Sequence, residues 1–78
     1  MNLSFTILME TKINAIILIL DTINEEIRKL KQVINKSDIL SNGQTEININ
    51  RIEYLEQRRL INENRLNGYN DGIRSVAN

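Results

Sequence analysis

With 78 residues, the chain forms one small domain at most, and a core of this size leaves only ~3–5 kcal/mol of stability without extra support. The chain has no Cys and no His, which excludes disulfides and thiolate or imidazole metal ligands, so association with other chains is the obvious source of support. Lys and Arg together number 10 and balance 10 Asp and Glu, which argues against nucleic acid bound through a large positive field.

The first residues alternate in polarity. Residues 2–7 read Asn-Leu-Ser-Phe-Thr-Ile, which places Leu3, Phe5 and Ile7 on one side of an extended strand. We therefore expect an N-terminal arm over residues 1–8, either frayed or extended; an extended arm could add a strand to a partner's sheet. One more turn of the helix that follows is the alternative. Translation from Met9 instead of Met1 is also left open, because Met9 is a natural helix start.

Residues 9–36 carry the strongest pattern in the chain. Apolar side chains recur there every three or four residues, the spacing that keeps one face of a helix against a partner helix. This apolar stripe, the seam of the first helix, consists of Met9, Ile13, Ile16, Leu20, Ile23, Ile27, Leu30 and Ile34. The pattern predicts a long helix that packs lengthwise against another helix.

A turn separates this helix from a second one. Residues 37–44 are rich in Asp, Ser, Asn and Gly, which compete with helical hydrogen bonding, so we expect a turn there and a second helix over 45–78. The apolar seam of the second helix consists of Ile52, Leu55, Leu66, Tyr69 and Ile73. Gly68 and the Asn70-Asp71-Gly72 run predict a break or kink within 67–72, with helix on both sides.

The two seams predict an antiparallel hairpin. With the turn centred near residue 41, Ile27 lies opposite Leu55 and Leu30 lies opposite Ile52, so seam positions meet without any forced register. The predicted fold class is all-α: an antiparallel, coiled-coil-like two-helix hairpin that completes a helical bundle by oligomerisation or partner binding.

Two polar residues, Arg59 and Asn62, interrupt the second seam. One interpretation is a polar contact that fixes register or oligomer order, or that binds a separate partner. The other, which we favour, is that the Arg59 stem covers the seam while its guanidinium reaches Glu25 or Glu26. The same register places both glutamates near Arg58 and Arg59, and such exposed pairs select orientation more than they stabilise.

Several apolar side chains do not belong to either seam. We expect them to form a surface for a partner: Leu3, Phe5, Ile7, Ile17, Leu18, Ile19, Leu60 and Ile61. Because their burial would outweigh the stability of an isolated hairpin, we expect a homo-oligomer or a subunit of a larger complex. Isoleucine at most positions of the first seam favours three or four strands in a parallel core, so a trimer of hairpins and a four-helix dimer both remain open.

No set of residues predicts catalysis, a metal site or a cofactor. Arg51, Arg58 and Arg65 recur every seven residues and resemble a phosphate-binding ladder, but Glu56 and Glu63 recur at the same interval on the other flank of the seam. Paired flanking charges of this kind are typical of helix bundles. We therefore expect no nucleic-acid partner and no enzyme.

A membrane role is a minor hypothesis. The longest uninterrupted apolar run, 15–20, has six residues, whereas a spanning helix needs ~20, and no basic side chain precedes residue 10 as a secretory signal would require. We expect an intracellular or virion-associated protein with no targeting segment. Anchoring of residues 1–20 at a membrane surface is kept as an alternative.

The resulting functional hypothesis is a non-enzymatic structural or assembly subunit, for example a component of a virus or phage particle. A small regulatory adaptor that captures a helix of one target protein is the principal rival.

Overall fold

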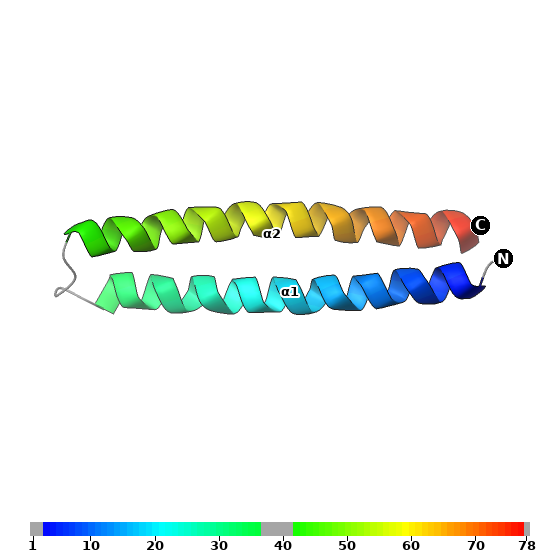
Figure 1. Ribbon diagram of the computed structural model, residues 1–78, viewed down its shortest axis with the longest axis horizontal. Coiled ribbons are helices and arrows are strands. Elements are labelled where there is room, and N and C mark those ends of the chain that lie inside the picture. The colour runs from blue at the N-terminus through cyan, green and yellow to red at the C-terminus, as the bar shows by residue number, and fades with distance from the viewer. Residues whose placement is uncertain (1–2, 37–41, 78) are drawn as a thin grey trace.

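Two long helices make up the described part of the chain. The computed structural model describes residues 3–36 and 42–77, which form α1 (Leu3–Lys36) and α2 (Asn42–Ala77). The helices run antiparallel and pack along their whole length (Figure 1). They form a rod of 58 × 14 × 14 Å, with the start of α1 and the end of α2 at the same end. The predicted all-α helical hairpin is therefore confirmed.

The core of the hairpin lies toward the connection between the helices. Ile23 and Ile27 of α1 pack with Ile52 and Leu55 of α2, and Leu30 and Ile34 pack against this cluster. Because Ile27, Leu30, Ile52 and Leu55 share one cluster, the structure agrees with the register that the seams predict. The chain contains no Pro, so no residue interrupts the backbone hydrogen bonds of either helix.

The expected extended arm is helical from Leu3 onward. A strand formed by residues 3–8 would leave its backbone N–H and C=O groups without partners, whereas a helix satisfies them internally. Phe5 also gains a neighbour in the helical arrangement, because its Cζ lies 4.0 Å from where a Cβ on Gly72 would stand. The alternation of polar and apolar residues was too short to outweigh these effects, and the alternative of one more helical turn describes residues 3–8.

The second helix is longer and less interrupted than the sequence predicts. It begins at Asn42 instead of Thr45, and it continues through 67–72 without the expected break. Gly68 and Gly72 each cost about 1 kcal/mol relative to Ala inside a helix. Contacts that bury Leu66, Tyr69 and Ile73 on both sides of the glycines offset that cost, since these side chains are half-buried against α1. Of the turn expected at 37–44, residues 42–44 are helical, and residues 37–41 lie outside the described residues.

Candidate interaction surfaces

The predicted seams form the inner faces of the two helices. Ile16, Ile23 and Ile27 of α1 are buried, as are Ile52 and Leu55 of α2. The remaining apolar members of both seams are half-buried: Met9, Ile13, Leu20, Leu30, Ile34, Leu66, Tyr69 and Ile73. The seams therefore face each other within one chain, and neither helix keeps its seam free for another protein.

Asn62 is the most deeply buried side chain of the described residues, at 1% exposure. Its Nδ2 donates a hydrogen bond of 2.8 Å to the carbonyl oxygen of Arg58, one helical turn earlier. The amide nitrogen is thus bonded within α2 and does not need an acceptor on α1. Asn62 can occupy a buried seam position because its side chain bonds to the backbone of its own helix.

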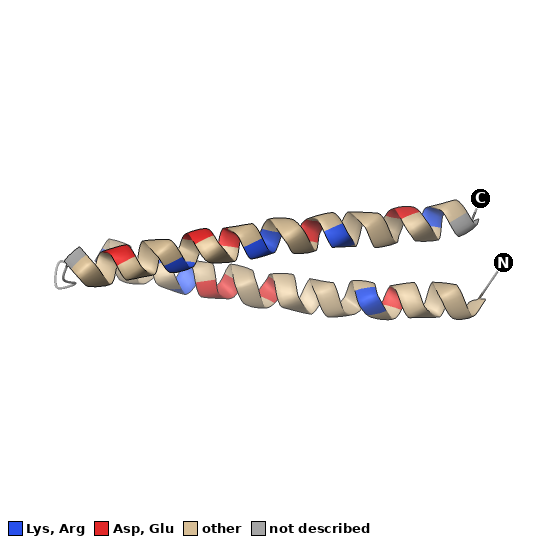
Figure 2. Cartoon of the chain, turned by 45° about the horizontal axis from the view of Figure 1, so that its top comes forward, with Lys and Arg blue, Asp and Glu red and all other residues tan. Residues whose placement is uncertain are grey.

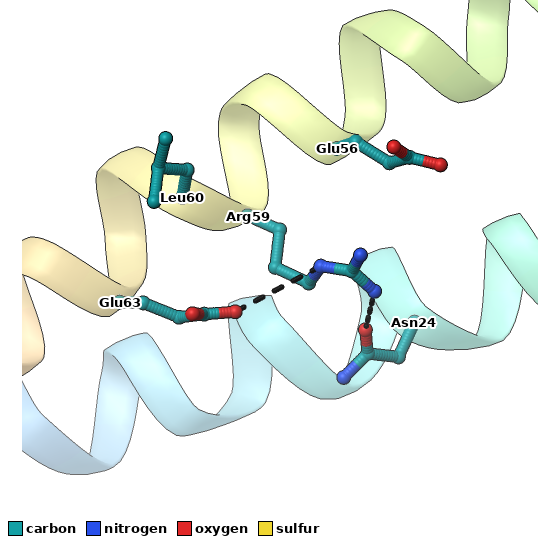
Figure 3. Close-up of a pocket in the computed structure, with 5 residues that line it drawn as sticks. All are labelled: Asn24, Glu56, Arg59, Leu60 and Glu63. Carbon is teal, nitrogen blue, oxygen red and sulfur yellow. Dashed lines mark hydrogen bonds and ion pairs between the residues drawn. The ribbon is translucent and has the colours of Figure 1, made fainter.

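Arg59 joins the two helices at one side of the seam. Its Nη1 donates a hydrogen bond of 3.0 Å to Oδ1 of Asn24, and its Nε lies 3.8 Å from a carboxylate oxygen of Glu63 (Figure 3). The guanidinium does not reach Glu25 or Glu26, so that expected contact is wrong. Arg59 instead makes a polar contact across the hairpin, as in the other interpretation.

The seam of α2 contains a third polar residue, Asn48, which was not predicted from the sequence. Asn48 is 8% exposed, and its Oδ1 accepts a hydrogen bond of 3.1 Å from Nε2 of Gln44. The signal for it was present, because Asn48 precedes Ile52 by four residues and continues the same heptad spacing. The seam of α2 is therefore polar at three places, whereas the seam of α1 is apolar from Met9 to Ile34.

Ion pairs lie at the edges of the hairpin. Glu26 binds Arg51 across the two helices, with Nε and Oε2 separated by 2.7 Å, and this hydrogen bond raises the pKa of the Arg51 guanidinium. Glu25 binds Arg28 within α1, where Nε and Oε2 are 3.1 Å apart. That hydrogen bond lowers the pKa of the Glu25 carboxyl. The expected pairing of these glutamates with Arg58 and Arg59 is wrong, because Glu25 pairs with Arg28 and Glu26 pairs with Arg51.

The expected partner surface is exposed at all of its residues except one. Leu3, Ile7, Ile17, Leu18, Ile19, Leu60 and Ile61 are exposed. Phe5 is half-buried beside Gly72, so it belongs to the contact between the helices and its assignment to the partner surface is corrected. Five apolar side chains outside the expected partner surface are also exposed: Leu8, Val33, Ile47, Ile49 and Tyr54.

The exposed apolar surface is densest in the first half of α1. Residues 3–20 contain one acidic and one basic residue, Glu10 and Lys12, and Figure 2 shows how sparse charge is in this part of α1. Thr11 and Thr22 donate their hydroxyls to the carbonyl oxygens of Ile7 and Leu18, at 3.0 and 2.9 Å. Because these hydroxyls are satisfied within the helix, this face can contact an apolar surface at little cost.

Residues that could support metal or acid–base chemistry do not gather in the described part of the chain. No group of three or more His, Cys, Asp or Glu side chains lies close enough there to hold a metal ion. Glu56 and Glu63, which flank Arg59, are both exposed. The surfaces that the hairpin offers are therefore apolar faces bordered by charge.

Among the described helices, α1 is long and apolar enough to cross a membrane, judged by length and composition alone. A core helix of a soluble protein or an N-terminal signal meets the same criterion, so this observation is weak by itself. The uninterrupted apolar run considered in the sequence was short because Glu10, Lys12 and Asn14 divide the apolar residues.

No protein-family model, curated protein or solved structure matches this chain.

Proposed function

We propose that the protein is a non-enzymatic structural or assembly subunit that acts by associating through the apolar surface its hairpin leaves exposed. The observation that carries this proposal is the exposure of large apolar side chains on both helices after the seams have paired. Leu18 is 68% exposed and Leu60 is 59% exposed. Large apolar side chains left exposed in number are typical of interaction sites on small proteins.

The shape of the hairpin supports the same proposal. A rod only 14 Å across has one line of contact between its helices, so each helix buries one stripe and exposes the rest. Burying a further Leu or Ile contributes roughly 1.5–3 kcal/mol, which is comparable with the whole stability of a domain of this size. Association would therefore stabilise the fold as well as perform the function.

A small adaptor that captures a helix of one target protein is a rival that would use the same exposed surface. Sedimentation velocity of the purified chain distinguishes the two functions. We expect a discrete oligomer whose population rises with concentration. A soluble monomer at every concentration up to the millimolar range would contradict the assembly proposal and favour the adaptor.

Matched variants test whether the exposed apolar residues carry the association. Leu18→Gln together with Leu60→Gln should weaken the oligomer and leave the helical circular dichroism signal unchanged, because neither side chain belongs to the buried cluster. Ser4→Gln with Asn67→Gln, at exposed polar positions, is the control. Equal oligomer populations in all three proteins would contradict the proposal.

Binding at a membrane is a second candidate, and the length and apolar composition of α1 favour it. Flotation of the full chain with neutral and with anionic vesicles tests this function. A chain that floats with vesicles, and loses that property in Leu18→Gln, would favour the membrane over self-assembly. The setting in a virus or phage particle stays a prediction from the sequence.

A further inference from the structure

The long edges of the hairpin carry opposite charges. Along a helix, residues seven apart project in the same direction, so each edge can be followed from a single contact that crosses the hairpin. Glu26 and Arg51 meet across one edge at 2.7 Å, and Asn24 and Arg59 meet across the other at 3.0 Å. These two contacts define the edges that we call the basic side and the acidic side.

The basic side runs through the Glu26–Arg51 contact. Its positive residues, all exposed or half-buried, are Lys12, Lys29, Lys36, Arg51, Arg58 and Arg65. Among the described residues, helical spacing places one carboxylate on this side, that of Glu26. It is paired with Arg51. Arg58 and Arg65 form no ion pair within the described part of the chain. This side therefore carries uncompensated positive charge.

The acidic side runs through the Asn24–Arg59 contact. Its negative residues, all exposed, are Glu10, Asp21, Glu46, Glu53, Glu56 and Glu63. Arg28, Lys31, Arg59 and Arg74 also lie on this side, but Arg28 binds Glu25, Arg59 lies 3.8 Å from Glu63, and Arg74 lies 3.8 Å from Asp71. The zero net charge of the chain thus conceals a separation of charge between its two edges.

Each side has exposed apolar residues near the middle of both helices. On the basic side, Ile19 of α1 and Ile61 of α2 are exposed. On the acidic side, Ile17 of α1 and Leu60 of α2 are exposed. An apolar centre with a charged surround is the usual composition of a protein–protein interface, and here both edges have it.

The charged residues of the two sides also match in spacing. Arg58 and Arg65 are seven residues apart, and so are Glu56 and Glu63, which corresponds to about 10 Å along a helix. Figure 3 shows the acidic side, where Glu56 and Glu63 border an open depression with Leu60. Two copies placed edge to edge could therefore align both arginines with both glutamates at once.

We propose that copies of this chain associate edge to edge, the basic side of one copy against the acidic side of the next. The inference deepens the proposed function and rests on it. A two-fold symmetric contact would bring like charges together on either side, which disfavours it. A contact between unlike sides leaves each end copy with one free side, so addition continues until a ring closes or a filament grows.

Charge reversal on one side at a time tests the proposal. The variant Arg58→Glu with Arg65→Glu puts glutamates at the matching α2 positions of both sides, and Glu56→Lys with Glu63→Lys puts basic residues there on both sides. We expect each variant alone to self-associate at least about tenfold more weakly than wild type, by sedimentation velocity at low salt. An equimolar mixture of the two variants should restore assembly, because acidic and basic copies can alternate.

Two controls separate charge position from net charge and from folding. Asn50→Glu with Asn64→Glu adds negative charge on the outward face of α2, between the two sides, and should leave assembly unchanged. All four charge reversals combined in one chain should restore assembly of that chain with itself, since glutamates at 58 and 65 can again face lysines at 56 and 63. Circular dichroism establishes that each variant is helical; where a reversal unfolds the chain, the Gln variants at the same positions replace it and should also weaken assembly.

The outcomes distinguish the inference from the function on which it rests. Wild-type oligomers that persist in both reversal variants, or helical variants that stay apart on mixing, would overturn the edge-to-edge arrangement and leave the assembly function standing. A wild-type chain that remains monomeric would overturn both. Binding of a single-stranded oligonucleotide by that monomer, lost in Arg58→Glu with Arg65→Glu, would assign the basic side to a polyanion.

Discussion

The two halves of the hairpin differ in how completely they bury their seams. Near the connection, Ile27 and Leu55 are each 4% exposed and lie in a cluster of six apolar residues. Toward the chain ends, Met9, Ile13 and Tyr69 are only half-buried. Of the five buried apolar side chains of the described residues, four thus lie in the half nearest the connection, and the half toward the chain ends holds the fifth, Ile16.

The cause of this difference lies in α2. Near the connection its seam presents Ile52 and Leu55, whereas farther along it presents Arg59 and Asn62, followed by helix that contains Gly68 and Gly72. The facing half of α1 is also the half with the most exposed apolar surface. The apolar heptad pattern of α1 is uniform, but the burial of its side chains is not, because burial requires matching residues on both helices.

Removing a side chain from the buried cluster should have the largest effect. Leu55→Ala should lower the free energy of unfolding by about 2–4 kcal/mol, because a fully buried Leu leaves a cavity when it is truncated. Urea denaturation followed by circular dichroism measures the change. Gln57→Ala, at an exposed polar residue on the same helix, is the control and should cost under about 0.5 kcal/mol. Equal losses would contradict the assignment of the core.

Filling the polar layer should make the two halves more alike. Asn62→Leu should raise the free energy of unfolding by about 1 kcal/mol, because the site is buried and the Arg58 carbonyl keeps its helical backbone partner. Thermal unfolding gives the measurement. Leu20→Asn should be better tolerated together with Asn62→Leu than alone, which tests the register. A loss of stability in Asn62→Leu would show that the amide makes a contact that α1 requires.

Replacing a glycine should strengthen the half that lies near the chain ends. Gly68→Ala should raise the free energy of unfolding by about 0.5–1 kcal/mol, since Ala favours the helix and a Cβ at this position has no atom within 4 Å outside the local backbone. Amide hydrogen exchange should show slower exchange in residues 64–72 than in wild type. Unchanged exchange there would contradict a helix that is continuous through Gly68.

Acid should have the smallest effect, and it acts on the half near the connection. Arg28 lowers the pKa of Glu25 in the folded chain below its ordinary value of 4.5, so the stability this pair contributes is present above that value. It is lost as the pH falls through the lowered pKa. The melting temperature of wild type should therefore fall more below about pH 4.5 than that of Glu25→Gln. Similar acid profiles in both proteins would contradict the pair.

Much of the fold could be predicted from residue spacing. The seam of α1 and the antiparallel pairing of Ile27 with Leu55 followed from heptad intervals and from a Gly-containing turn between two long apolar patterns. The helical state of residues 3–8 could not be predicted, because an alternation of six residues fits a strand equally well and the contact of Phe5 with Gly72 exists only after folding. Rotamers and local distances decided which arginine reached Glu26.

Helical periodicity converts residue intervals directly into direction, so the spacing of apolar residues was enough to predict two helices and the apolar face of each. The depth at which each layer is buried, the polar residue that bonds to its own helix, and the charges that meet across the hairpin became known from the folded arrangement. These properties depend on the distance between the surfaces of the two helices, which the residue pattern of one helix does not specify.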